Sequence, residues 1–211
     1  QSRQAPPGMF KDVDDEIVGE APIIRGKQLF VDDGIVQEIR GLERQLNQPV
    51  KFAGNPVLRR DKPWEESGPG YGTVHYDAES KQFRMWYAFW RKTKGTSTAL
   101  LAYATSNDGK QWTKPVMDAA TGTNLLRHPP IQGFQCPGIF KDARETDPNK
   151  RYKMLFSCNP DGTEKTWMTS VAFSADGFQW TPAGETASIP FSDTQICPFW
   201  DEHRRCYVAI L

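Results

Sequence analysis

The sequence predicts an all-β protein, a β-propeller of four-stranded antiparallel blades. Three observations lead to this fold class: a repeat of about 68 residues, an Asp-Gly turn that recurs within it, and a composition rich in aromatic residues, Gly and Pro. The 211 residues include 12% aromatics, 17 Gly and 16 Pro. That balance is typical of short strands joined by many turns.

The repeat is clearest at its Asp-Gly turn. Residues Ala104–Thr113 match residues Ala172–Thr181, with identical residues recurring at an offset of 68. Asp-Gly between two β-runs predicts a hairpin turn, because Gly accepts a positive φ without steric cost. We interpret Asp108 and Asp176 as turn residues, and we expect the Trp three positions after each Gly to pack between neighbouring sheets.

A second recurring pattern precedes each Asp-Gly turn. A short strand ends at Asp77 and is followed by the aromatic-rich run Phe83–Ala88. Asp142 and Asp201 occupy the same place in the next two copies. Each unit therefore reads as four short antiparallel strands, which is the composition of a propeller blade. The units fall at about residues 55–115, 124–183 and 190–211.

The repeats divide the chain into two predicted parts. Residues 1–27 are expected to form an N-terminal leader, and residues 28–211 an incomplete propeller domain. Residues 28–36 are the first credible strand pair, and residues 37–49 suit either a short helix or a strand. The third unit stops within its second strand at Leu211, which leaves about two and a third blades. We expect the remainder of the propeller, from further polypeptide or another chain, to complete the ring.

Charge, apolar runs and cysteine content argue against several classes of function. The 26 basic and 26 acidic residues cancel, which gives no support for nucleic-acid binding. No apolar run reaches the roughly 20 residues of a membrane span, so no membrane association is expected. The cysteines form no CxxC pair and there are three histidines, so neither a metal nor a cofactor is expected. Buried free thiols and one or two disulfides are both compatible with Cys136, Cys158, Cys197 and Cys206.

Three stretches resemble a known superfamily. Residues Asn55–Glu65, Tyr71–Asp77 and Ala102–Trp112 are similar to blades of five-bladed propeller glycosidases. The nearest groups are glycoside hydrolase families 32, 43 and 130, above all bacterial proteins similar to the N-terminal part of family 32. The resemblance implies five blades when complete, an oligo- or polysaccharide partner, and export to a secreted or periplasmic location. It also implies carboxyl groups on the innermost strands, near a central funnel.

The turn aspartates give a register for these acids. In the resembling families an inner-strand Asp lies about eight residues before the turn, and that count leads from Asp201 to Asp193. We expect Asp193 to be catalytic or to contact substrate. The same count from Asp142 leads to Phe134, which is not an acid. Asp142 itself is similar to the Arg-Asp-Pro acid of family 32, although its equivalence to Asp77 favours a turn.

The first unit supplies two more candidate acids and an aromatic. Glu65 and Glu66 lie in a loop with enough Gly and Pro to reach over a central cavity; solvated loop charges are the alternative. Trp64 beside them is a candidate to stack on a sugar ring. Trp86 and Trp112 are expected in the core.

Inner-strand polar residues are candidate substrate contacts. Tyr71 and His75 share one strand face by period two, and Gln135 opens the corresponding strand of the second unit. A structural histidine is the alternative at His75. The basic residues Arg91, Lys92 and Lys94 follow an aromatic strand and suit either an anionic group or a solvated turn.

Two functions follow from these assignments. The first is an exported glycoside hydrolase, in which one carboxylic acid protonates the leaving oxygen and another carboxylate activates water or attacks the anomeric carbon. The alternative is a non-catalytic propeller that binds carbohydrate or protein, which the absence of an acid at Phe134 favours. A third case is a chain that is inactive alone because residues outside it complete the site.

Overall fold

The structure is a computed structural model that describes residue 34 and residues 36–93, 96–162, 166–184 and 189–211. It divides into two compact units, Gln1–Val50 and Lys51–Leu211. In the first unit, residues 36–50 form neither of the predicted elements, helix or strand. The predicted strand pair at 28–36 and the boundary at residue 27 lie outside the described residues, apart from Gly34 and Val36.

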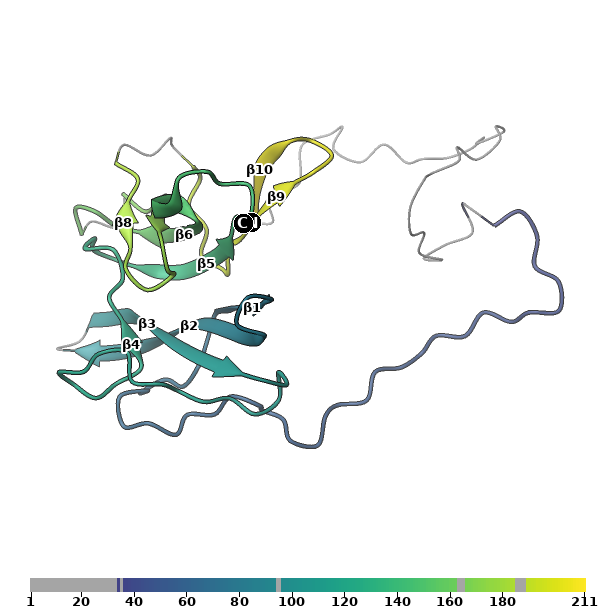
Figure 1. Cartoon of the computed structure of the whole chain (residues 1–211), viewed down its shortest axis with the longest axis horizontal. Coiled ribbons are helices and arrows are strands. Elements are labelled where there is room, and N and C mark those ends of the chain that lie inside the picture. Colours follow the sequence, from purple (N-terminus) through teal and green to yellow (C-terminus); the bar gives the residue numbers. More distant parts are fainter. Residues whose placement is uncertain (1–33, 35, 94–95, 163–165, 185–188) are drawn as a thin grey trace, which may run out of the picture. The chain divides into compact units, whose positions relative to one another are not determined.

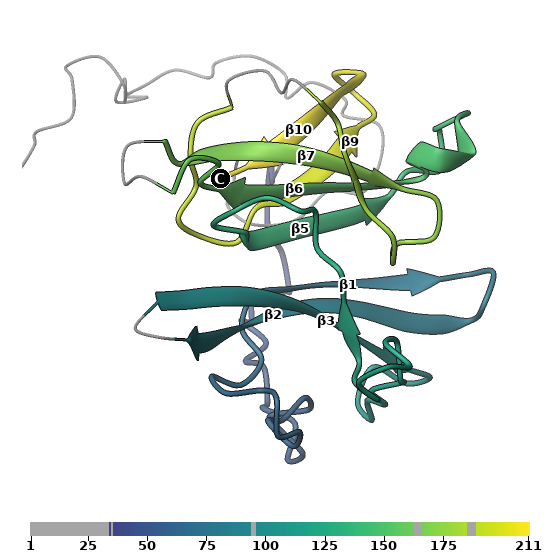
Figure 2. The same ribbon diagram turned by 90° about the vertical axis from the view of Figure 1, so that its left-hand side faces the viewer.

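The second unit consists of antiparallel sheets, as the fold prediction requires. Two four-stranded sheets have the orders β1-β2-β3-β4 and β5-β6-β7-β8, and a hairpin of β9 and β10 follows. The two sheets lie one over the other, as successive blades (Figures 1 and 2). The strands are β1(Gly72–Asp77), β2(Gln82–Thr93), β3(Thr96–Ser106), β4(Leu125–Leu126), β5(Gln135–Lys141), β6(Tyr152–Cys158), β7(Met168–Ser174), β8(Thr181–Pro182), β9(Cys197–Asp201) and β10(Cys206–Ile210), with a 3-10 helix at Pro148–Lys150.

The prediction of an all-β, partial propeller is confirmed by this architecture. Within the described residues, the one helical element is that short 3-10 turn, and no helix is long and apolar enough to cross a membrane. The observed blades run from β1 to β4 and from β5 to β8, and β9 and β10 begin a third.

The first strands of the three blades lie side by side. The Ile139 amide of β5 donates to Thr73 Oγ1 of β1 at 3.1 Å. On the other side of β5, a Cβ added to Gly138 would lie 2.1 Å from the Ile196 carbonyl oxygen and 2.6 Å from Pro198 Cδ. Only a residue without a side chain allows this approach, because real Cβ atoms do not come so close to a backbone oxygen.

Gly138→Ala is therefore expected to lower the free energy of unfolding by about 2 kcal/mol, because overpacking a close contact typically costs 1–3 kcal/mol. Urea denaturation measures the change. The control is Ala143→Gly, at an exposed position of the same blade. Gly184 is not used for the control, because its φ of +81° strains any other residue. An unchanged midpoint in Gly138→Ala would contradict the close packing of β5 against β9.

The main core lies between the two blades. Trp86 and Leu101 of the first sheet pack with Ile139, Met154 and Phe156 of the second, and all five are fully buried. The neighbouring residue Tyr87 points to the opposite face of β2, where it packs with Phe89, Ala102 and Trp112. Because alternate residues of β2 serve two faces, both faces of the first blade are apolar. The predicted core positions of Trp86 and Trp112 are confirmed.

The Asp-Gly turns form as predicted. Asp108 Oδ1 accepts the amides of Lys110 and Gln111, both at 2.8 Å, and Gly109 has φ +71°. The same bonds recur around Asp176 in the second copy, where the amides of Phe178 and Gln179 donate at 2.7 and 3.0 Å. Both aspartates are therefore turn residues.

The second copy of the turn also joins the two blades. Trp86 Nε1 of β2 donates to the Gly177 carbonyl at 2.7 Å. A Cβ at Gly177 would lie 2.8 Å from Trp86 Cζ2, so glycine is required for this close approach as well as for its φ of +83°. The turn that the repeat predicted thus carries a contact between blades.

The four cysteines are unpaired. Cys136 and Cys158 are buried, whereas Cys197 and Cys206 are exposed. The two buried cysteines fit the free-thiol alternative.

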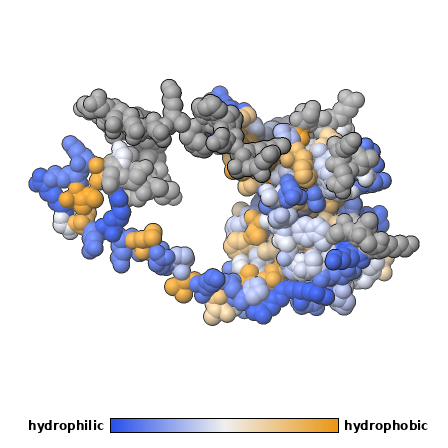
Figure 3. Space-filling view, turned by 180° about the vertical axis from the view of Figure 1, so that it is seen from behind, coloured by the Kyte–Doolittle hydropathy of each residue, from blue (hydrophilic) through white to orange (hydrophobic). Residues whose placement is uncertain are grey.

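Apolar side chains also reach the surface of the sheets (Figure 3). The exposed ones include Val74, Tyr76, Phe199, Tyr207 and Ile210.

Candidate functional site

The inner strands β1, β5 and β9 all begin at the same end of the blades. We call this end, where the strands start at Gly72, Gln135 and Cys197, the leading edge. Tyr71 immediately precedes β1, and its hydroxyl donates to the Asp193 carbonyl at 3.5 Å. Cys136 near the start of β5 lies close enough to Asp193 for the aspartate charge to raise the pKa of its thiol. The structure therefore brings together Tyr71 and Asp193, two of the predicted site residues, next to the start of β5.

The segment that carries Asp193 is fixed to the second blade. Ser157 Oγ of β6 donates to the Ser192 carbonyl at 2.5 Å, and Thr169 Oγ1 of β7 donates to the Pro190 carbonyl at 2.7 Å. Gln195 Nε2 donates to the Pro137 carbonyl at 2.8 Å. Ser157 and Thr169 are fully buried, so these bonds are shielded from water.

Asp193 itself is exposed at the leading edge. Among the described residues, no donor lies within hydrogen-bond distance of its carboxylate, so both oxygens are open to a ligand. Burial, and then the negative charge of Asp193, raises the pKa of the Cys136 thiol to about 11. Cys136 is therefore a neutral thiol at physiological pH and does not act as a nucleophile here.

Two aromatic pairs lie at the strand ends where Asp193 is found. Tyr71 and Trp90 meet edge to face, with ring centroids 5.5 Å apart. Trp167 and Phe191 lie 5.3 Å apart at an interplanar angle of 41°. Trp90, Trp167 and Phe191 are not among the residues predicted from the sequence to form the site. The position of Phe191, two residues before Asp193, is the signal that would have drawn attention to it.

Glu65 has no exposed surface. Its Oε1 accepts the Tyr87 hydroxyl at 2.7 Å, and its Oε2 accepts the Lys114 ammonium at 2.7 Å. The amides of Asp61 and Lys62 donate to Oε2 at 3.2 Å each. These bonds satisfy the carboxylate, so Glu65 anchors its own loop to the first blade. Its predicted catalytic role remains a prediction, and this geometry does not favour it.

Trp64 belongs to the same buried network. Its Nε1 donates to Asn124 Oδ1 at 2.9 Å, and Asn124 Nδ2 donates to the Tyr87 hydroxyl at 2.7 Å. The half-buried indole packs with the apolar face around Tyr87. Burial, followed by the bond to Glu65, raises the pKa of Tyr87. Trp64 is thus turned toward the protein, and its predicted contact with a sugar remains untested.

Glu65→Gln is expected to lower the free energy of unfolding by about 2 kcal/mol, because a hydrogen bond to a charged group contributes about 1.5–3 kcal/mol. Of the ionic partners of Lys114 among the described residues, the Asp61 carboxylate alone would remain, although the Lys114 side chain is 4% exposed. Thermal unfolding at matched pH measures the loss. Glu66→Gln next to it is the control, and equal stability of both variants would contradict an anchoring role for Glu65.

Glu66, in contrast, is exposed beside the end of β2. Its Oε2 accepts the Lys92 amide at 3.0 Å, and Arg91 Nε lies 3.4 Å from Oε1. Arg91 is therefore paired within the chain. Lys94, the third basic candidate, lies outside the described residues.

His75 and Gln135 differ in their surroundings. The His75 ring meets Trp86 edge to face at 5.8 Å, and its Nε2 is buried without a hydrogen-bond partner among the described residues. Burial, with the nearby positive charge of Arg84, lowers the pKa of His75. This packing fits the structural alternative. Gln135 is half-buried at the start of β5, opposite Ser157 of β6, and so lies on the leading edge.

Asp142 lies at the opposite end of β5. Its Oδ1 accepts the Arg144 amide at 3.0 Å, as Asp77 Oδ1 accepts the Glu79 amide at 3.1 Å. Its Oδ2 meets Lys153 Nζ at 2.9 Å and accepts the Tyr207 hydroxyl at 2.7 Å. Burial alone would raise the pKa of Asp142, but these partners lower it. The structure thus places Asp142 in the shared turn, away from Asp193.

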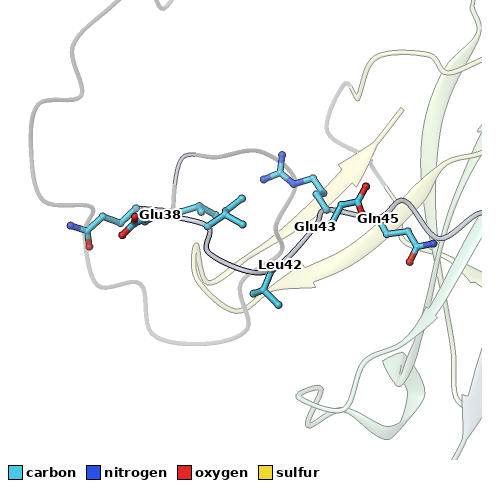
Figure 4. Close-up of a pocket in the computed structure, with 8 residues that line it drawn as sticks. Glu38, Leu42, Glu43 and Gln45 are labelled. Carbon is cyan, nitrogen blue, oxygen red and sulfur yellow. The ribbon is translucent and has the colours of Figure 1, made fainter.

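A second group of titratable side chains lines a hollow at the turn end of the inner strands, and it contains the predicted residues His75 and Asp142 together with Asp77 and Glu145. Within the described residues, no group of three or more His, Cys, Asp or Glu side chains is arranged to hold a metal ion. A hollow in the first unit is lined by exposed side chains, including Glu38, Leu42, Glu43 and Gln45 (Figure 4). None of the predicted site residues belongs to it.

Comparison with known proteins gives structural matches alone. No protein-family model and no curated protein matches the sequence. The chain is similar to an N-acetylgalactosamine deacetylase from F. plautii in complex with blood group B trisaccharide, with a TM-score of 0.54 and 14% identity over 74% of this chain and 47% of that one.

Two fructofuranosidases also match. One, from Schwanniomyces occidentalis and complexed with fructosylnystose, has a TM-score of 0.49 and 18% identity over 78% of this chain and 33% of that one. The other, a family 32 β-fructofuranosidase from Bombyx mori, has a TM-score of 0.44 and 11% identity over 72% and 31%. The chain spans less than half of each of these structures. The predicted resemblance is confirmed at the level of the fold, which the chain shares with the F. plautii structure.

Proposed function

We propose that this chain forms part of an exported glycoside hydrolase whose substrate lies at the leading edge. The observation that carries the proposal is the exposed Asp193 carboxylate, which has no hydrogen-bond partner in the described part of the chain while its backbone is fixed to the second blade. A reactive carboxyl group must be both rigidly placed and accessible. Two of the similar structures contain bound oligosaccharides, which supports a saccharide as the substrate.

The reaction would use Asp193 as one of two carboxyl groups. One carboxylic acid protonates the leaving oxygen, and the other carboxylate activates water or attacks the anomeric carbon. Tyr71 and Gln135 lie on the same edge and would bind hydroxyl groups of the sugar. Glu66 is the remaining candidate for the second carboxyl group, because it is exposed, although it pairs with Arg91, whereas Glu65 and Asp142 are buried.

A carbohydrate-binding propeller without catalysis is the second candidate. The observation that favours it is Phe134, the position of the second blade that the register makes equivalent to Asp193. A phenyl ring has no acidic or basic group, so Phe134 can neither donate nor accept a proton. It is buried, and its ring stacks on that of His128 with the centroids 4.6 Å apart. A site with a single inner-strand acid could hold a saccharide without cleaving it.

An incubation experiment on the protein with its whole propeller distinguishes the two candidates. The glycans offered are fructosylnystose, blood group B trisaccharide and a panel of plant and microbial glycans. New reducing ends, detected by mass spectrometry, are the expected result for the hydrolase. Binding of a glycan without any release of product would instead support the binding propeller. Neither binding nor release across the panel would contradict both.

A further inference from the structure

The segment before Asp193 presents an aromatic ring to solvent. Phe191 is 40% exposed, whereas Ser192 between it and Asp193 is buried. The carbonyls on either side of Phe191, those of Pro190 and Ser192, both accept hydrogen bonds from buried hydroxyl groups of the second blade. The backbone on both sides of Phe191 is therefore fixed to the second blade, so less freedom is lost when the residue binds a ligand.

Trp167 enlarges this aromatic surface. Its ring lies 5.3 Å from that of Phe191, and a Cβ added to Gly133 would lie 3.1 Å from Trp167 Cη2. Gly133 precedes β5, and Trp167 immediately precedes β7, which pairs with the end of β6. Both rings therefore lie at the leading edge, on segments that contact the second blade.

We infer that Phe191 and Trp167 form a stacking subsite for one sugar ring of an oligosaccharide bound at Asp193, an inference that rests on the proposed function. The C–H face of a sugar ring packs on an aromatic face, and the hydroxyl groups at its rim need polar partners. The Cα atoms of Phe191 and Asp193 are at most about 7 Å apart, because an extended chain spans no more than 3.6 Å per residue. A sugar ring stacked on Phe191 would therefore lie next to the residue that carries the exposed Asp193 carboxylate, a strong acceptor.

The subsite is tested with Phe191→Ala and Trp167→Ala on an array of defined oligosaccharides, followed by titration of a glycan that the wild-type protein binds. Each substitution is expected to weaken binding about tenfold, and Phe191→Tyr to restore it. The control is Phe52→Ala. Phe52 is 47% exposed and contacts Lys110 beside the Asp108 turn, at the far end of β3 from the leading edge.

The outcomes separate the subsite from the proposed function. Weaker binding in both alanine variants, with Phe52→Ala unchanged, supports the subsite. If the wild-type protein cleaves or binds glycans and both alanine variants bind equally well, the subsite is wrong and the proposed function stands. If the wild-type protein binds no oligosaccharide of the array, both are wrong. Circular dichroism of each variant verifies that a weaker signal does not come from unfolding.

Discussion

Replacing Arg84 by Ala is expected to lower the free energy of unfolding by about 4 kcal/mol, because removal of one partner from a buried charge pair typically costs 3–5 kcal/mol. The guanidinium group joins the two blades. Its Nε donates to the Tyr103 hydroxyl at 2.8 Å, and its Nη1 donates to the Tyr152 hydroxyl at 2.5 Å and to Asp77 Oδ2 at 3.4 Å. Nη2 donates to the Asp176 carbonyl at 3.0 Å.

The aromatic surroundings make the shape of this side chain as important as its charge. The guanidinium carbon lies 4.9–5.6 Å from four ring centroids, those of Trp86, Tyr103, Tyr152 and Phe178. A lysine keeps the charge but not the planar group with several donors. Arg84→Lys should therefore be less stable than the wild-type protein and more stable than Arg84→Ala. Arg84→Ala also leaves Asp77 with Lys141 as its remaining ionic partner among the described residues.

Chemical denaturation of Arg84→Ala, Arg84→Lys and the control Arg151→Ala measures these differences. Arg151 is an exposed arginine of the second blade, and its replacement should change stability by less than about 0.5 kcal/mol. A loss below about 1 kcal/mol in Arg84→Ala would contradict the assignment of Arg84 as a link between blades. The second blade uses the same device, since Lys153 binds Asp142 and lies 5.4 Å from the Tyr207 ring of β10.

The sequence predicted the features that are encoded locally. The Asp108 and Asp176 turns are each closed within a few residues, so a short motif contains all their hydrogen-bond partners. The alternation of β2 also follows from local pattern, because Trp86 and Tyr87 must point to opposite faces. These features, repeated once, were sufficient to predict the blades.

The links between distant residues could not be predicted in this way. Glu65 has the loop composition of a mobile acid, yet Lys114, 49 residues later, holds it in the interior. Arg84 meets Tyr152 and Asp176 across 68 and 92 residues. Such contacts depend on how whole blades pack against each other, and the spacing of residues within a short motif does not reveal them. Asp193 was predicted from the eight-residue count that the resembling families imply, whereas the side chains that fix its backbone come from β6 and β7 and could not be identified from the sequence.

Asp193→Asn is expected to reduce turnover of a cleaved glycan about 10³-fold, because general acid–base catalysis by a positioned group contributes 10²–10⁴-fold. This corresponds to about 4 kcal/mol of transition-state stabilisation. Asparagine has nearly the same shape as aspartate but can neither transfer the proton nor form the covalent intermediate. Glycan affinity should change far less than turnover, because the amide still hydrogen-bonds to sugar hydroxyls.

The stability of Asp193→Asn distinguishes a catalytic carboxylate from a structural one. The carboxylate has no hydrogen-bond partner among the described residues, so its loss should leave the unfolding midpoint unchanged, unlike the loss of Glu65. Glu202→Gln is the matched control, an exposed acid of the turn between β9 and β10 that pairs with Arg144 at 3.4 Å. Full turnover in Asp193→Asn would exclude the catalytic role. Lost turnover with a lowered midpoint would indicate that Asp193 supports the fold, because a purely chemical role leaves stability intact.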